Sequence, residues 1–167
     1  MWSLVGVVVL LVANYYLATF CIWFGHWFSH LKGGPLTRMH VSGHHVLYPN
    51  SREVLSAAFR YASWNHDSTI TLLPWLMVAN FLEYLLMPGW LFIIALSETV
   101  VLMTLITYVH QQFHLVESRL MRFEWFRSAR SLHALHHDRD VNFMVADHSW
   151  DRLMRTYCQL DDQTPCS

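Results

Sequence analysis

Three long apolar segments constrain the fold more than any other feature of the chain. Residues 2–23 contain no charged residue, and residues 70–87 and 90–109 contain one carboxylate each, Glu83 and Glu98. Because a helix rises about 1.5 Å per residue, about 20 apolar residues cross a hydrocarbon core of about 30 Å. The sequence therefore predicts an all-α fold, a polytopic bundle of about three transmembrane helices.

The two carboxylates inside these segments are functional candidates, because ionisable groups are rare within a membrane. Glu83 lies near the end of its segment, where it could reach the membrane interface. Glu98 lies closer to mid-membrane, between Ser97 and Thr99. Two interpretations of Glu98 stand at this point: a hydrogen-bonded packing group, or a residue that lines a cavity.

The composition supports the same class of protein. Hydrophobic residues make up 54% of the chain and charged residues 14%, whereas soluble domains average about 25% charged residues. A chain of 167 residues is expected to form one domain, residues 1–167. The net charge of −1 does not by itself indicate a partner, and we expect no nucleic-acid partner. Cys21, Cys158 and Cys166 lack the spacing of a zinc site or a disulfide framework, and we expect neither.

The positive charges predict the orientation of the chain in the membrane. All eleven lysines and arginines lie in residues 32–60 or 119–155. By the positive-inside rule both basic segments are cytoplasmic. Three crossings satisfy this condition, with the N-terminus extracytoplasmic, the C-terminus cytoplasmic, and the turn at Pro88 and Gly89 outside.

Shorter elements are predicted between the apolar segments. The first helix is expected to continue past the membrane and to end at Gly33, where Gly and Pro interrupt the chain. A short helical stretch follows over residues 40–45, and residues 48–51 read as a turn. Apolar residues at helical spacing predict an interfacial amphipathic helix over residues 54–64.

Histidines form four clusters in the predicted helical parts. On a helix, positions i, i+3 and i+4 share a face, so each cluster can aim its imidazoles at one point. Ten ligands are too many for one metal ion and suit two ions with five ligands each, but imidazole alone does not identify the metal. The candidate ligands are His26, His30, His40, His44, His45, His110, His114, His133, His136 and His137.

All four clusters fall on the predicted cytoplasmic side. Because that topology follows from charges and apolar segments rather than from histidines, it independently supports one shared cytoplasmic site. Metal-bound histidines usually donate their other ring N–H to a carboxylate or a carbonyl. Residues near the last cluster are candidates for these outer positions: Asp138, Asp140, Asn142, Asp147, His148 and Asp151.

Some of these residues have alternative interpretations. The segment from Asp138 to Asp140 also reads as a solvated turn, and Asp151 could instead pair with an arginine. His66 lies outside the four clusters and is interpreted as a solvated loop residue.

The clusters and a C-terminal segment with Asn142-Phe143 and Trp150-Asp151-Arg152-Leu153 resemble the fatty acid hydroxylase/sterol desaturase superfamily. The resemblance covers residues 26–157. It implies a cytosolic di-iron site with O2 as the oxidant, and zinc is able to replace iron in overexpressed protein. The chain departs from the family pattern in its cluster spacing and its number of crossings, and it has no fused haem-binding electron-transfer domain. Its second cluster has the spacing H-x3-HH rather than H-x2-HH, and it has three predicted crossings rather than four.

Three functions are consistent with these features. The first is a hydroxylase acting on a lipid or another amphiphile, of the fatty acyl, sphingolipid or sterol class. The second is a desaturase that uses the same site, and the third is a non-catalytic metal- or haem-binding membrane protein. Either enzyme needs a separate electron donor of the ferredoxin or cytochrome type with its reductase. A basic stretch after the third apolar segment is expected to contact lipid headgroups or such a donor: Arg119, Arg122, Arg127 and Arg130.

Overall fold

The computed structural model describes residues 3–49, 55–60 and 69–159, and these form a helical protein. No strand occurs among them apart from an isolated bridge between Ser56 and Leu115, so the predicted all-α class is confirmed. Short 3-10 turns cover Thr69–Thr71 and Arg119–Arg122. The longer elements are α1 (Leu4–Ser29), α2 (Pro35–Met39), a π-helix (His40–His45), α3 (Leu73–Leu86), α4 (Gly89–Phe113), α5 (Glu124–Asp138) and α6 (Ser149–Leu153).

Two helices, α1 and α4, are long and apolar enough to cross a membrane, with 26 and 25 residues. Only 28% of the apolar window of α1 and 17% of that of α4 are buried within the protein. A core helix of a soluble protein would be mostly buried, so these faces are suited to contact with lipid. The third apolar segment forms a shorter helix, α3, of 14 residues. It begins at Leu73 with Pro74 in its first turn, where proline is tolerated.

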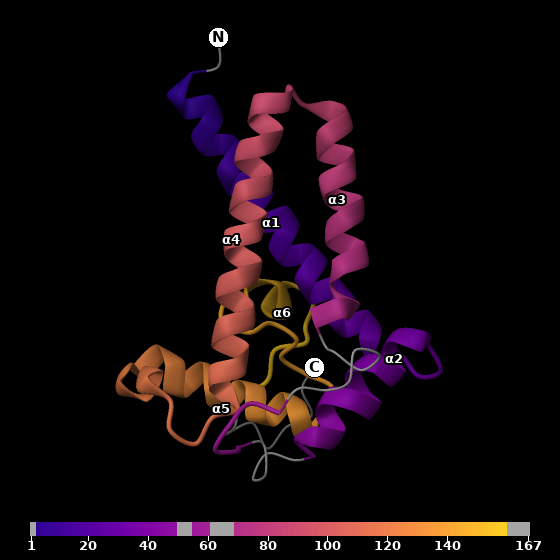
Figure 1. Cartoon of the computed structure of the whole chain (residues 1–167), viewed down its shortest axis with the longest axis vertical. Helices are drawn as coiled ribbons and strands as arrows, with labels where there is room; N and C mark the ends of the chain where they lie inside the picture. Colours follow the sequence, from indigo (N-terminus) through magenta and orange to yellow (C-terminus); the bar gives the residue numbers. More distant parts are fainter. Residues whose placement is uncertain (1–2, 50–54, 61–68, 160–167) are drawn as a thin grey trace.

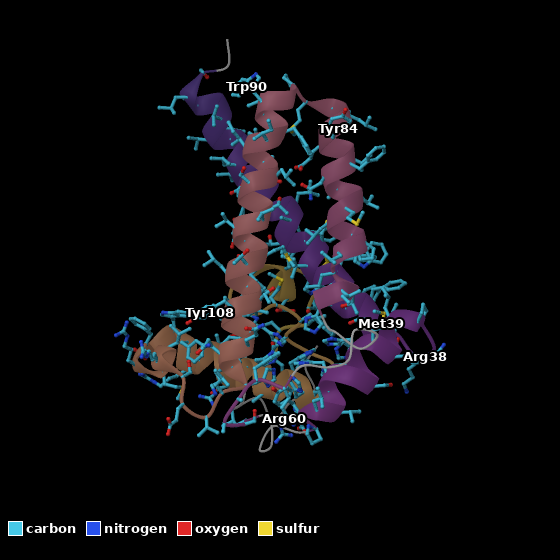
Figure 2. All side chains as sticks on the ribbon, in the orientation of Figure 1. Arg38, Met39, Arg60, Tyr84, Trp90 and Tyr108 are labelled. Atoms are coloured by element: carbon cyan, nitrogen blue, oxygen red, sulfur yellow. The ribbon has the colours of Figure 1, made fainter. Side chains whose placement is uncertain are left out.

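The elements divide into an apolar half and a histidine-bearing half. Figure 1 shows α3 and α4 as a hairpin, with α1 crossing behind it and α2, α5 and α6 gathered at the end opposite the hairpin turn. In Figure 2, Tyr84 and Trp90 lie near that turn, and Arg38 and Arg60 lie at the opposite end. Tyr108 lies close to the boundary between the halves. The helical rise from Trp90 to Tyr108 is about 27 Å, which is close to the thickness of a hydrocarbon core. Aromatic residues favour such interfaces.

A close approach of α1 and α3 fixes the end of α1 that carries histidines. A Cβ atom added at Gly25 would lie 2.5 Å from Cδ1 of Trp75 and 3.3 Å from Cδ2 of Leu72. The Trp75 ring is itself enclosed by Phe24 and Phe28, with ring centroids 4.8 and 5.2 Å away. Small residues allow membrane helices to approach closely. Gly25 therefore permits α3 to pack directly beside the first histidine of α1.

The two membrane carboxylates are held inside the bundle. The buried Asn14 amide donates to Glu98 Oε2 at 2.7 Å and to the Ala95 carbonyl at 3.0 Å. Glu98 is thus a hydrogen-bonded packing group that joins α1 to α4, which is one of the two interpretations from the sequence. Glu83 is only 7% exposed. Its side chain faces the bundle, on the same face of α3 as Leu76 and Asn80, and it lies in the last turn of α3.

The amphipathic helix predicted over residues 54–64 is wrong for its described part. Residues 55–60 are not helical. The backbone N–H of Ser56 donates to the His114 carbonyl, and the Ser56 carbonyl accepts from the backbone N–H of Val116. Pairing with the segment after α4 prevails over the local apolar spacing, because short patterns do not specify a helix against tertiary contacts. The remainder of the predicted helix lies outside the described residues, as does half of the turn predicted over residues 48–51.

The expectation of no disulfide was also wrong. Cys158 is disulfide-bonded, whereas Cys21 is a free thiol buried in α1. A single pair of cysteines has no spacing signature, because the bond depends on how the folded chain brings two Cβ atoms together.

Candidate metal centre

Nine of the ten candidate histidines lie in two compact groups, each with its ligand atoms within 4.8 Å of one another. Such groups could hold metal ions. The first group contains His26, His30, His40, His45 and His136, and the second contains His44, His114, His133 and His137. The tenth candidate, His110, lies beside the second group, with its ring centroid 4.7 Å from that of His44 and 4.8 Å from that of His133.

Adjacent histidines divide between the groups. His44 belongs to the second group and His45 to the first, whereas His136 belongs to the first and His137 to the second. The rings of His45 and His137 stack across the boundary with centroids 4.2 Å apart. Because each His-His pair supplies one histidine to the first group and one to the second, the two groups are neighbours.

A π-helix explains the unusual spacing of the second cluster. Residues His40–His45 form one turn of π-helix, which has i→i+5 hydrogen bonds and accommodates one more residue than an α-helical turn. In an α-helix, a histidine at i+5 would turn away from the face of His40. The wider turn returns His45 to that face, where its Nε2 atom lies 3.2 Å from His40 Nε2.

The distances between ring nitrogens match those of ligands around one ion. Two nitrogens bound at 2.0–2.1 Å and at angles between a right angle and the tetrahedral angle are about 2.8–3.4 Å apart. The Nε2 atoms of His26 and His40 are 2.9 Å apart in the first group. In the second group, His133 Nε2 lies 3.0 Å from that of His114 and 3.1 Å from that of His137.

Several ring nitrogens in the groups lack a protein partner. Within the described part of the chain, the buried Nε2 atoms of His30, His44 and His136 have no hydrogen-bond partner. A buried polar atom without a partner is unfavourable. Three such atoms that face the same histidine groups are accounted for if they bind metal.

Four ring Nδ1 atoms are fixed by acceptors outside the groups. His136 donates to the Val141 carbonyl and His137 to the Tyr48 carbonyl, both at 2.8 Å. His26 donates to the Phe143 carbonyl, and His30 donates to Asp140 Oδ1 at 2.8 Å. A carbonyl only accepts, so the proton lies on Nδ1 and the Nε2 lone pair faces the group. This is the arrangement that usually orients metal-bound histidines.

Of the outer residues expected from the sequence, only Asp140 contacts a histidine of the two groups. Asp147 accepts from Tyr15, and Asp138 lies 4.0 Å from Arg139. Asn142 instead bonds the backbone of Cys158. The carbonyls of Tyr48, Val141 and Phe143 were missed, because every residue carries a carbonyl and the sequence gives no sign of which one is used.

Asp151 acts on the groups indirectly. Its fully buried carboxylate accepts from the backbone N–H groups of Phe143 and Met144 at 2.9 and 3.0 Å. It also accepts from His148 Nδ1 at 2.9 Å and from the Thr156 hydroxyl at 2.8 Å. Asp151 and His148 therefore hold the loop whose Phe143 carbonyl orients His26. Among the described residues, Asp151 does not pair with an arginine, which was the alternative interpretation from the sequence.

Burial keeps the imidazoles neutral. Burial first, and then the neighbouring imidazoles, hold the pKa values of His40, His44, His133 and His136 well below the ordinary value. Burial likewise lowers the pKa of His137 to about 3. Neutral imidazole is the form that binds a metal ion, so the rings are ready to bind at neutral pH.

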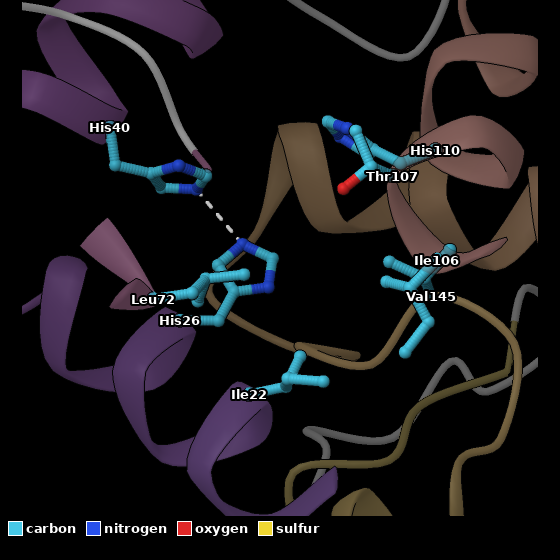
Figure 3. A pocket seen from close by; sticks show the side chains of 8 residues that line it. All are labelled: Ile22, His26, His40, Leu72, Ile106, Thr107, His110 and Val145. Atoms are coloured by element: carbon cyan, nitrogen blue, oxygen red, sulfur yellow. Dashed lines mark hydrogen bonds between the residues drawn. The ribbon is translucent and has the colours of Figure 1, made fainter. Parts of the chain in front are cut away.

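A small cavity and a larger hollow are lined by histidines of the site. A cavity of about 30 Å³ lies on the apolar side, and in Figure 3 His26, His40 and His110 face it together with Thr107. On the other side, a hollow of about 300 Å³ is lined by His30, His45, His136 and His137 with Asp138, Arg139 and Asp140. The site thus lies between an apolar and a polar approach.

Comparison of the chain with protein-family models, with curated proteins and with solved structures gives no match. The function is therefore inferred from the geometry of the histidine groups and their surroundings.

Proposed function

We propose that this protein is a membrane-bound, O2-dependent di-iron oxygenase that hydroxylates a C–H bond of a lipid or lipid-like substrate. The observation that carries the proposal is the pair of adjoining histidine groups, which share two His-His dipeptides. Haem needs axial ligands on opposite faces of a flat ring, whereas these imidazoles converge on two neighbouring points. This favours two metal ions over the haem-binding alternative.

The donor set fits iron that cycles with O2. All nine group members are imidazoles, and no carboxylate of the described residues belongs to either group. Imidazole suits iron, and ions in such a site keep their full positive charge. When bound, two ferrous ions would supply the activation of O2. In hydroxylation, one C–H bond is replaced by C–OH, and O2 with two electrons and two protons yields the hydroxyl group and one water.

The residues of the chain orient the imidazoles and exclude water. The Phe143 ring packs against His26, His30 and His136, with centroids 5.3–5.7 Å away. On the other group, the Tyr48 ring stacks on His114 at 3.9 Å. Both aromatic residues are almost fully buried. Because these two rings keep water away from the histidines that they cover, a strong oxidant at the site would be protected there from side reactions with solvent.

We infer that α3 is the third crossing. Its 14 residues span about 21 Å, and a bilayer adapts to a short segment by thinning. Three crossings place the N-terminus outside and both the histidine groups and the C-terminus in the cytoplasm, as the positive charges indicate.

The two electrons come from a separate donor of the ferredoxin or cytochrome type. In the basic stretch after α4, the Arg127 side chain donates to the Met121 carbonyl and that of Arg130 to the Leu115 carbonyl. We therefore propose that Arg119 and Arg122 attract an acidic donor. Their replacement by glutamate should slow turnover with the protein donor and leave turnover with a small chemical reductant unchanged.

The experiment that tests the function supplies isotopically heavy O2 to membranes with the protein, a lipid extract and reductant, followed by mass spectrometry of the lipids. A hydroxylase places one heavy oxygen atom in the product. A new double bond without heavy oxygen would show a desaturase instead, and an unchanged lipid pool at full metal occupancy would contradict catalysis.

Matched variants connect the product to the site. His137→Ala should abolish the product and lower the metal content. His66→Ala is the control: His66 lies outside the described residues and outside the four clusters, and its replacement should change neither quantity.

A further inference from the structure

A groove of about 650 Å³ runs between α3 and α4. Its walls are mostly apolar and include Leu76 and Met77 of α3 and Val100 and Met103 of α4. A volume in this range is typical of small-molecule sites. Met77 and Val100 are 69% and 56% exposed, so the groove opens sideways from the helices that would face lipid.

The groove leads to the histidines. Thr107 lines both the groove and the small cavity that His26, His40 and His110 face. Figure 3 shows the Thr107 hydroxyl beside that cavity, one turn from His110 on α4. The groove and the cavity at the histidines therefore adjoin at Thr107.

One polar atom in the groove lacks a partner. The Asn80 amide donates to the Leu76 carbonyl at 2.7 Å. Its buried Oδ1 atom has no hydrogen-bond partner within the part of the chain that the structure describes. An amide oxygen only accepts, and a buried acceptor without a donor is unfavourable. A ligand with a hydroxyl or N–H group at this level would satisfy it.

We propose that this groove binds the substrate of the oxygenase, an amphiphile from the bilayer that donates a hydrogen bond to Asn80 Oδ1. The inference rests on the proposed function and adds the position of oxidation. Leu72 lines the cavity at the histidines, and Asn80 lies eight residues further along the chain. That separation corresponds to about 12 Å along a helix. The oxidised carbon therefore lies about 12 Å from the donor group of the substrate.

The test uses two photoreactive probes in membranes that contain the protein: a long-chain alcohol with a diazirine, and its methyl ether. The alcohol can donate to Asn80, whereas the ether cannot. One hydrogen bond corresponds to about 2- to 12-fold tighter binding. The alcohol should therefore label the groove residues of α3 and α4 more strongly than the ether by that factor, and Asn80→Leu should remove the difference.

A second pair of variants tests the groove without its polar atom. Thr107→Trp fills the junction with the histidine cavity and should reduce labelling near it by both probes. Leu105→Trp is the control, because Leu105 is 55% exposed and does not line the groove. The Leu105→Trp variant should be labelled by both probes to the same extent as the unchanged protein. The melting temperatures of both variants are compared to detect misfolding.

Equal labelling of the groove by alcohol and ether, or labels spread evenly over the outer faces of the helices, would overturn the proposal. Labelling requires no turnover. If the groove labels as expected but no oxygenated product forms, the oxygenase function fails. If product forms without groove labelling, only the substrate site is wrong.

Discussion

Replacement of Asp151 by asparagine tests how the loop before α6 holds the metal centre. The carboxylate is fully buried and accepts four hydrogen bonds, two at each oxygen. An asparagine of nearly the same shape keeps one accepting oxygen. Its NH2 group would face two donors, so two hydrogen bonds are lost and two buried donors are left without an acceptor.

The size of the effect follows from these contacts. Hydrogen bonds to a charged group contribute about 1.5–3 kcal/mol each, so the loss of two lowers the free energy of unfolding by about 3–6 kcal/mol. The Phe143 backbone joins Asp151 to His26, because its N–H donates to Asp151 and its carbonyl accepts from His26. Outer partners of this kind alter metal affinity by about 10–100-fold.

The assay measures the melting temperature of Asp151→Asn in detergent and its metal retention against a chelator. Asp138→Asn is the matched control: its carboxylate is 49% exposed and lies 4.0 Å from Arg139, and a surface pair of this kind contributes about 0–1 kcal/mol. If Asp151→Asn melts and retains metal like the unchanged protein, the role assigned to Asp151 is refuted.

Three further predictions follow from the structure. Gly25→Ala should lower the melting temperature, because the new Cβ meets the enclosed Trp75 ring at 2.5 Å and overpacking costs about 1–3 kcal/mol. Gly89→Ala is the control, because nothing lies within 4 Å of a Cβ at that position. Equal melting temperatures of the two variants would contradict the packing of α1 on α3. The metal-free protein should lose stability as the pH falls from about 6.5 towards 3, because the lowered pKa of His137 means that the unfolded chain binds more protons in this range. Acid titration followed by circular dichroism measures this loss, and constant stability over the range would disprove it. A cysteine placed at position 89 should react with an impermeant reagent from outside the cell, and a C-terminal tag should be cytoplasmic. A tag that is accessible from outside would reverse the topology. That result would agree with the disulfide at Cys158, because disulfides are rare in the cytosol.

The sequence predicts the helices from the length of the apolar segments, and the gathering of the histidines from their helical spacing. The apolar segments correspond to α1, α3 and α4. His26 with His30, and His110 with His114, follow helical spacing and bring each pair to one face. Spacing does not show which group each histidine joins, because neighbours such as His44 and His45 separate only once the elements pack together.

Other features depend on the folded backbone and leave no pattern in the sequence. The π-helix at His40–His45 turns an irregular spacing into a shared face. The acceptors for three ring N–H groups are carbonyls, which residue type does not reveal. Asp151 is recognisable as a candidate from its position near the last cluster, but its four bonds arise from a loop that closes around it.

The central claim is that two neighbouring ions are held by two groups of imidazoles. The most direct measurement is the number of metal ions per chain, determined by native mass spectrometry and elemental analysis of protein purified without oxygen. The account predicts two ions per chain, and the loss of His44 or His45, which serve different groups, should leave one of them bound. A single ion per fully loaded chain, or none, would contradict the account.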